Sequence, residues 1–217
     1  MGSITFGIPR ALTKGIAHKF NSTLFVETGT YFGETAKWAS NVFETVITCE
    51  PAPKIYARAL ESTLKISNIS VSPLESVSFL KANHSLVASS NAPVFWLDSH
   101  PKGGDTYGIG QPVPLLKELD IIFSSHPQPF ILIDDIRIFA CPEYFGFTSD
   151  HWPSIQQITS SLPNRFRYYQ VGDVALILST TGSSAGKLFE DLKEQERSSY
   201  DQNTLYRKLK SIFGLLR

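Results

Sequence analysis

Short apolar runs alternate with longer segments of helical periodicity along most of this chain. The runs with the length and character of buried strands are 24–26, 45–49, 93–98 and 130–133, and a shorter, weaker strand pattern lies at 69–72. Helical spacing of apolar residues predicts helices at 9–20, after Gly33, from Pro53, at 77–88 and from Pro114. This alternation predicts an α/β fold, with a doubly wound, mostly parallel sheet and helices on both faces.

The last two β-rich runs break the alternation. Arg167–Gln170 and Val174–Ser179 are joined by a short connection that contains Gly172, which predicts an antiparallel hairpin. The whole would be a seven-stranded Rossmann-like sheet that ends in this hairpin. A chain of 217 residues fits one domain. We expect an N-terminal helical segment at 1–22, a core at 23–180 and a C-terminal helical segment at 187–217.

The C-terminal segment carries an apolar stripe at helical spacing. Its members are Leu205, Leu209, Ile212, Phe213 and Leu216. Such a stripe is typical of a helix packed on its own domain, and a contact in a homodimer is the alternative. The sequence leaves both interpretations open.

Charge and cysteine content exclude several kinds of partner. Lys and Arg number 20, as do Asp and Glu, so no net field recruits nucleic acid or an anionic membrane. Cys49 and Cys141 make no disulfide framework, and we expect both to be reduced thiols. With no signal peptide and no apolar run near the length of a bilayer, a cytoplasmic protein is expected.

The turn after the first apolar run carries the most specific pattern. Its sequence is Glu27-Thr28-Gly29-Thr30-Tyr31-Phe32-Gly33. A dinucleotide fingerprint needs G-x-G-x-x-G and a bare helix N-terminus for pyrophosphate, whereas this turn has two glycines and an acid that would repel it. Glu50 lies 21 residues beyond Gly29 and closes the second strand, where a carboxylate can accept hydrogen bonds from ribose hydroxyls.

This segment resembles motif I of the class I S-adenosylmethionine-dependent methyltransferases, an acid, any residue, Gly, three residues, Gly. The resemblance implies S-adenosyl-L-methionine as the cofactor. It places Glu27, Gly29, Thr30 and Gly33 around the methionine part and Glu50 on the ribose. Glu75, after the third strand, stands where such enzymes often contact the adenine, and Asp98, after the fourth, is a further cofactor contact.

Carboxylates also close the fourth and fifth strands. Asp98, Asp134 and Asp135 would meet at one edge of the sheet and form an oxygen-rich site suited to Mg²⁺. The set resembles the metal ligands of sugar and macrolide O-methyltransferases, although Ser99-His100 stands where that subset has a second acid and an aromatic residue. The alternative is that Asp134 or Asp135 caps the next segment and binds no metal.

His100 lies on the loop that would face the acceptor, beside Asp98. A hydroxyl that receives a methyl group must lose its proton, and a histidine is suited to take it. We therefore predict His100 as the catalytic base, with Asp98 also catalytic. The glycine-containing loop 101–111 would bind or cover the acceptor, with a mobile surface connection as the alternative. The aromatic stretch 141–152 would wall the acceptor pocket, with a plain hydrophobic core as the alternative.

The sequence thus predicts an S-adenosylmethionine-dependent enzyme that methylates oxygen of a small molecule or saccharide, with or without the help of a metal ion. Two alternatives remain. One is a nicotinamide-dependent oxidoreductase, for which the turn lacks the third glycine. The other is a methyltransferase-like binding or scaffold protein without catalytic activity.

Overall fold

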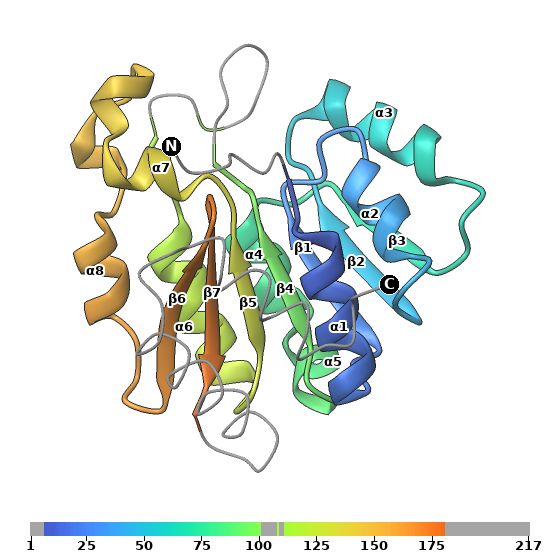
Figure 1. The fold of residues 1–217 in the computed structure, drawn as a ribbon. Helices are drawn as coiled ribbons and strands as arrows, with labels where there is room; N and C mark the ends of the chain where they lie inside the picture. The colour runs from blue at the N-terminus through green and yellow to red at the C-terminus, as the bar shows by residue number, and fades with distance from the viewer. Residues whose placement is uncertain (1–6, 101–107, 109–110, 181–217) are drawn as a thin grey trace.

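The structure is a computed structural model that describes residues 7–100, 108 and 111–180 (Figure 1). Its strands are β1 (Leu24–Thr28), β2 (Thr45–Cys49), β3 (Ile69–Ser72), β4 (Val94–Leu97), β5 (Phe130–Ile133), β6 (Phe166–Val171) and β7 (Val174–Ser179). Its α-helices are α1 (Arg10–Phe20), α2 (Glu34–Ala39), α3 (Pro53–Thr63), α4 (Ser76–Ala82), α5 (His84–Ser89), α6 (Leu115–Ser125), α7 (Ile136–Ala140) and α8 (Ile155–Ser160). Two 3-10 helices lie at Pro142–Phe145 and Ser149–His151. The predicted acceptor loop, except Gly108 and Gln111, and the predicted C-terminal helix with its dimer contact lie outside the described residues.

The strands form one seven-stranded sheet in the order β3-β2-β1-β4-β5-β7-β6. Strands β1 to β5 pair in parallel, and β7 is inserted antiparallel between β5 and β6. This confirms the predicted doubly wound sheet with its terminal hairpin. The chain runs outward from β1 to β3 and then returns to β4 on the other side of β1. Such a reversal leaves a crevice at the carboxyl ends of β1 and β4, where open α/β sheets bind ligands.

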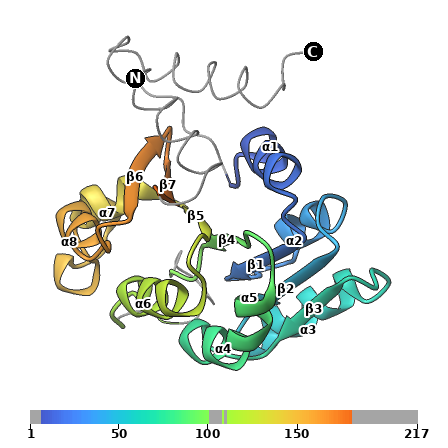
Figure 2. The same cartoon turned by 90° about the horizontal axis from the view of Figure 1, so that it is seen from below.

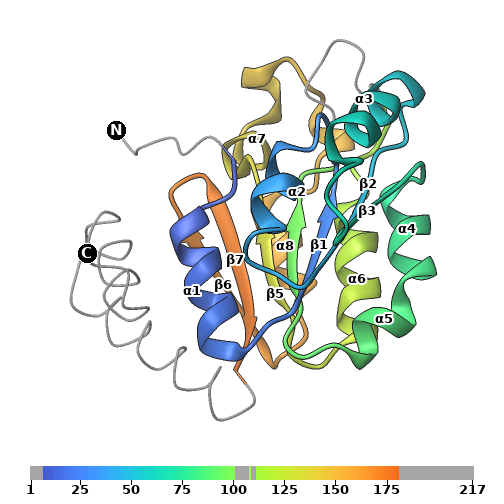
Figure 3. The same cartoon turned by 90° about the vertical axis from the view of Figure 1, so that its right-hand side faces the viewer.

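Each face of the sheet has its own apolar core because successive side chains of a buried strand point to opposite sides. On β1, Phe25 packs with α1 and α2, whereas Leu24 and Val26 pack with α4, α5 and α6. Figures 2 and 3 show α1 and α2 on one side of the sheet and α4, α5 and α6 on the other. The central strands are therefore buried on both faces, as their continuous apolar sequences predict.

The predicted helix at 77–88 is instead two short helices, α4 and α5, separated at Asn83. The Asn83 side-chain amide donates to the carbonyl oxygen of Phe79 at 2.9 Å. Asparagine favours such local side-chain bonds and is a weak helix former, which is consistent with a helix boundary at this residue. The apolar spacing carries through the break, so the pattern alone predicted one helix.

Within the described residues, no helix has the length and apolar character needed to cross a bilayer. Cys49 and Cys141 are both free thiols, the first buried and the second exposed.

Candidate functional site

A cavity of about 1480 Å³ opens at the carboxyl ends of β1, β2, β4 and β5. Its wall contains the turn after β1, the end of β2, the start of α4 and the loops after β4 and β5. Of the predicted site residues it includes Gly29, Thr30, Glu50, Glu75, Asp98, His100 and Asp134. Glu27, Gly33 and Asp135 lie outside its lining. The cavity occupies the crevice that the strand order creates.

Gly29 is required by the backbone that follows β4. Its φ is +92°, a conformation that L side chains rarely adopt, and an added Cβ would overlap the carbonyl oxygen of Asp98. The turn therefore lies directly against the start of the predicted catalytic loop. Gly33, at φ +83°, faces α3 instead, where an added Cβ would lie 3.0 Å from Thr63 Cγ2. The sequence interpretation assigned Gly33 to the cofactor. In the structure, the atoms nearest to its missing Cβ belong to α3, so Gly33 also allows α3 to pack closely against this turn.

Glu27 is buried behind the cavity wall. Thr48 Oγ1 donates to Glu27 Oε2 at 2.7 Å, and the hydroxyls of Thr48 and Thr30 lie 2.6 Å apart. Thr30 itself lines the cavity. The carboxylate of Glu27 thus connects to the cavity through two hydroxyl groups, and its predicted role beside the cofactor stays a prediction.

Glu50 presents its carboxylate at the end of β2. Oε2 accepts from the N–H of Tyr31 at 3.1 Å, and Oε1 accepts from the N–H of Ala52 at 3.0 Å. Burial raises the pKa of Glu50, and these two N–H groups partly offset the rise. Each carboxylate oxygen keeps a second lone pair, so Glu50 can still accept from a ligand hydroxyl.

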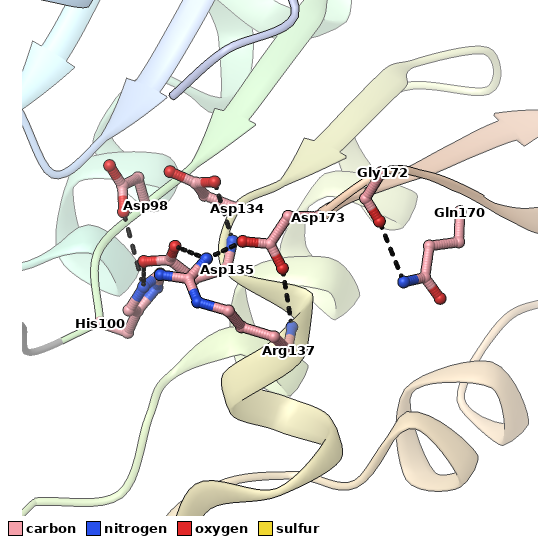
Figure 4. A network of polar contacts seen from close by, with 8 residues as sticks. All are labelled: Asp98, His100, Asp134, Asp135, Arg137, Gln170, Gly172 and Asp173. Atoms are coloured by element: carbon pink, nitrogen blue, oxygen red, sulfur yellow. Dashed lines mark hydrogen bonds and ion pairs between the residues drawn. The ribbon is translucent and has the colours of Figure 1, made fainter. Parts of the chain in front are cut away.

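His100 lies beside two carboxylates. Its Nε2 is 2.9 Å from Asp135 Oδ2 and 3.6 Å from Asp98 Oδ1 (Figure 4). The imidazole is buried, and the rings of Trp152 and Phe139 contact it edge-on at centroid distances of 5.3 and 5.8 Å. These contacts fix the position of the ring while it remains part of the cavity wall.

Asp135 is the residue before α7 and has a left-handed backbone, with φ 54°. Its side chain makes no capping hydrogen bond. Oδ1 lies 2.7 Å from Arg137 Nη1, and Oδ2 holds His100. Capping of the next helix is the alternative role that the sequence allows for Asp135. In the structure, Asp173 of the β6–β7 turn caps α7 instead, because its Oδ1 accepts from the N–H of Arg137 at 3.0 Å.

The predicted metal set does not meet at one point. In the described part of the chain there are two groups of three residues whose ligand-type atoms lie within 4.8 Å of one another inside each group. One group is Asp98, His100 and Asp135, and the other is Asp134, Asp135 and Asp173. Both depend on Asp135, whose Oδ1 lies 2.7 Å from the Arg137 guanidinium and whose Oδ2 lies 2.9 Å from His100 Nε2, so a metal ion bound there would meet the positive charge of Arg137. These contacts do not fit Mg²⁺, which demands near-ideal octahedral oxygen ligation.

The predicted aromatic wall is present in part. Ser149, Asp150, His151, Trp152 and Pro153 line the cavity. Tyr144, by contrast, is 83% exposed and lies outside the lining.

Glu118 of α6 lies behind the cavity wall and supports it, a role that the sequence interpretation missed. It is 1% exposed, and Ser99 Oγ donates to its Oε1 at 2.7 Å. Burial raises its pKa, which hydrogen bonds from Ser76 and Ser99 partly counter. Ser76 and Ser99 line the cavity on its two sides. The available signal was spacing, because Glu118 falls on the apolar stripe of Leu115, Leu119 and Ile122.

A scan against protein-family models and a search of curated proteins found no match. Solved structures are similar over most of the chain. An O-methyltransferase from Bacillus cereus, in complex with S-adenosylhomocysteine (SAH), aligns with TM-score 0.55 and 12% identity over 82% of this chain and 83% of that chain. The O-methyltransferase TomG from Streptomyces achromogenes, involved in tomaymycin synthesis and in complex with S-adenosylmethionine (SAM), aligns with TM-score 0.54 and 11% identity over 82% of each chain.

A third similar structure is the SAH-bound methyltransferase PaMTH1 from Podospora anserina. It aligns with TM-score 0.52 and 12% identity, over 82% of this chain and 91% of that chain. At these identities the likeness establishes the fold. The chain has the class I SAM-dependent methyltransferase fold, as the resemblance of its glycine turn implied.

Proposed function

We propose that this protein is a SAM-dependent methyltransferase that acts on an oxygen atom of a small molecule or saccharide. One observation carries the proposal. A single cavity at the switch point of the sheet is lined both by Glu50, a carboxylate suited to ribose, and by His100, a buried base. The fold supports this proposal. The described sheet has an antiparallel strand, β7, between β5 and β6, and the usual dinucleotide-binding order, 3-2-1-4-5-6, has no such inserted strand.

The cofactor side of the cavity would be formed by Gly29, Thr30, Glu50 and Glu75. Gly29 and Thr30 donate backbone N–H groups to the carbonyl oxygen of Cys49, which fixes the turn against β2. Glu50 would accept hydrogen bonds from the ribose, and Glu75 from the adenine. When bound, SAM would supply an activated methyl group on a sulfonium for transfer to an oxygen nucleophile, with SAH as the leaving group.

The acceptor side would use His100 as the base. If Nε2 carries the hydrogen that binds Asp135, the lone pair is on Nδ1, which takes the proton of the acceptor hydroxyl. Asp135 then stabilises the imidazolium that forms, and Asp98, 3.6 Å from the same nitrogen, adds to that field. Trp152 and the residues around it would exclude water from the acceptor.

The metal-assisted form of the reaction would place a divalent cation at Asp98, Asp134 and Asp135. The contacts of Asp135 favour proton transfer through His100 instead, and no step above requires a metal.

Calorimetric titration with SAH, in magnesium and again in EDTA, tests the proposal against its two alternatives. Micromolar SAH affinity supports a methyltransferase and justifies a screen of hydroxylated acceptors. Affinity for NAD instead would indicate an oxidoreductase. If neither ligand binds, the scaffold interpretation takes precedence.

Glu50→Gln tests the ribose assignment with little change in volume. We expect SAH affinity to fall by about 1–3 kcal/mol, the contribution of a charge-assisted hydrogen bond. Glu61→Gln is the control, because Glu61 is an exposed acid of α3 outside the cavity. Equal SAH affinity in both variants would remove Glu50 from the cofactor site.

A further inference from the structure

Four carboxylates lie at one edge of the sheet (Figure 4). Asp98 follows β4, Asp134 and Asp135 follow β5, and Asp173 lies in the turn between β6 and β7. Like charges at this separation are costly in a buried site unless a cation offsets them. Both groups of ligand-type atoms at this edge share Asp135. What occupies Asp135 therefore decides whether a metal can bind.

Arg137 occupies it. The guanidinium Nη1 lies 2.7 Å from Asp135 Oδ1 and also forms an ion pair with Asp173 Oδ2. The other oxygen of Asp135 holds His100. One arginine thus joins two carboxylates from different parts of the sheet, on the side of Asp135 away from the imidazole.

The fold fixes this arginine at both of its ends. The backbone N–H of Arg137 donates to Asp173 Oδ1 at 3.0 Å, and the N–H of Ile136 donates to the carbonyl oxygen of Asp173 at 2.9 Å. The hairpin turn therefore determines where α7 begins. It also brings the Asp173 side chain, 6% exposed, to the guanidinium.

We propose that the Arg137 guanidinium takes the place of a divalent cation at this edge. It neutralises Asp135 and Asp173, holds Asp135 in the position that orients His100, and repels any metal ion that approaches the same oxygens. The role toward His100 rests on the proposed function. The exclusion of metal does not, and can be tested without turnover.

Mn²⁺ binding to the full chain, measured by electron paramagnetic resonance after dialysis against EDTA, tests the exclusion. The wild type should bind no Mn²⁺ below millimolar concentration. Arg137→Met removes the positive charge and retains an unbranched side chain like the aliphatic part of arginine. It should bind Mn²⁺ at least tenfold more tightly than the wild type, and Asp135→Asn added to it should abolish the gain.

Arg167→Met is the matched control, since Arg167 is an exposed arginine of β6 that donates to the carbonyl oxygens of Asn164 and Phe166. It should bind Mn²⁺ no better than the wild type. Micromolar Mn²⁺ binding by the wild type, lost in Asp135→Asn, would overturn the proposal whether or not Arg137→Met folds. A folded Arg137→Met protein, checked by circular dichroism, that gains no Mn²⁺ affinity would also overturn it.

SAH titration of the same wild-type sample keeps the two proposals separate. SAH binding together with Mn²⁺ binding would retain the methyltransferase and reject the role of Arg137. Absence of both would reject the methyltransferase and leave the metal exclusion standing.

Discussion

At the scale of single residues, Gly29 has the strictest requirement in the site. It combines a positive φ with direct backbone contact to Asp98, so its substitution incurs both strain and overlap. Gly146 separates the two effects, because it has φ +81° and open space around the missing Cβ.

Gly146→Ala should therefore lower the free energy of unfolding by about 1 kcal/mol, the usual backbone strain. Gly29→Ala should lower it by about 3 kcal/mol or more, because the Asp98 backbone is held against β1 by the hydrogen bond from its N–H to the carbonyl oxygen of Thr28. Urea denaturation measures both. Equal losses would mean that the turn after β1 does not press on the Asp98 backbone as described.

Glu118 makes stability depend on pH in a predictable direction. Burial raises its pKa above the ordinary value of 4.5, so its stabilising contribution is complete below that pH and is lost as pH rises through the folded-state pKa. Glu118→Gln removes the titration, and its side-chain oxygen can still accept from Ser99.

The melting temperature of Glu118→Gln should thus rise relative to the wild type as pH increases above 4.5. Thermal melts from pH 4.5 to pH 8 measure the difference in melting temperature between Glu118→Gln and the wild type. Titrating groups that both proteins share contribute equally to the two melting temperatures and cancel in this difference. Glu61→Gln, at an exposed site, should track the wild type at each pH. A constant difference for Glu118→Gln would show that its carboxyl does not titrate abnormally.

At the scale of elements, the strands could be predicted because a buried parallel strand requires a continuous apolar run, as in Phe130–Ile133. The hairpin could be predicted from its glycine turn. The break between α4 and α5 could not, since it lies at a single residue, Asn83, within an unbroken apolar pattern.

The same reasoning accounts for the candidate site. Strand order brings the ends of β1, β2, β4 and β5 to one cavity, so Glu50, Asp98 and His100 could be proposed from sequence. Arg137 and Asp173 could not, because their pairing depends on the antiparallel return of β7 beside β5. Sequence gives the end of each strand but not which cationic side chain lies beside the carboxylates there, and the metal prediction depends on that contact.

At the scale of the whole molecule, the two apolar cores share one sheet. Val26 belongs to the core that contains Trp152, and its neighbour Phe25 belongs to the core that contains Trp96. Neither core can lose its strands without exposing the other, which favours a single cooperative unit. The two buried tryptophans therefore report on opposite faces of the sheet.

A single domain predicts that both tryptophans lose their burial at the same temperature. Trp38→Phe combined with Trp152→Phe leaves Trp96 as the probe, and Trp38→Phe combined with Trp96→Phe leaves Trp152. For each double variant, the midpoint from tryptophan fluorescence should coincide with the midpoint from far-ultraviolet circular dichroism, because the shared strands unfold together. The comparison is made within each variant, so a loss of stability from the substitutions does not affect it. Midpoints that differ by several degrees in either variant would mean that one face of the sheet unfolds while the other persists, which a shared sheet does not allow.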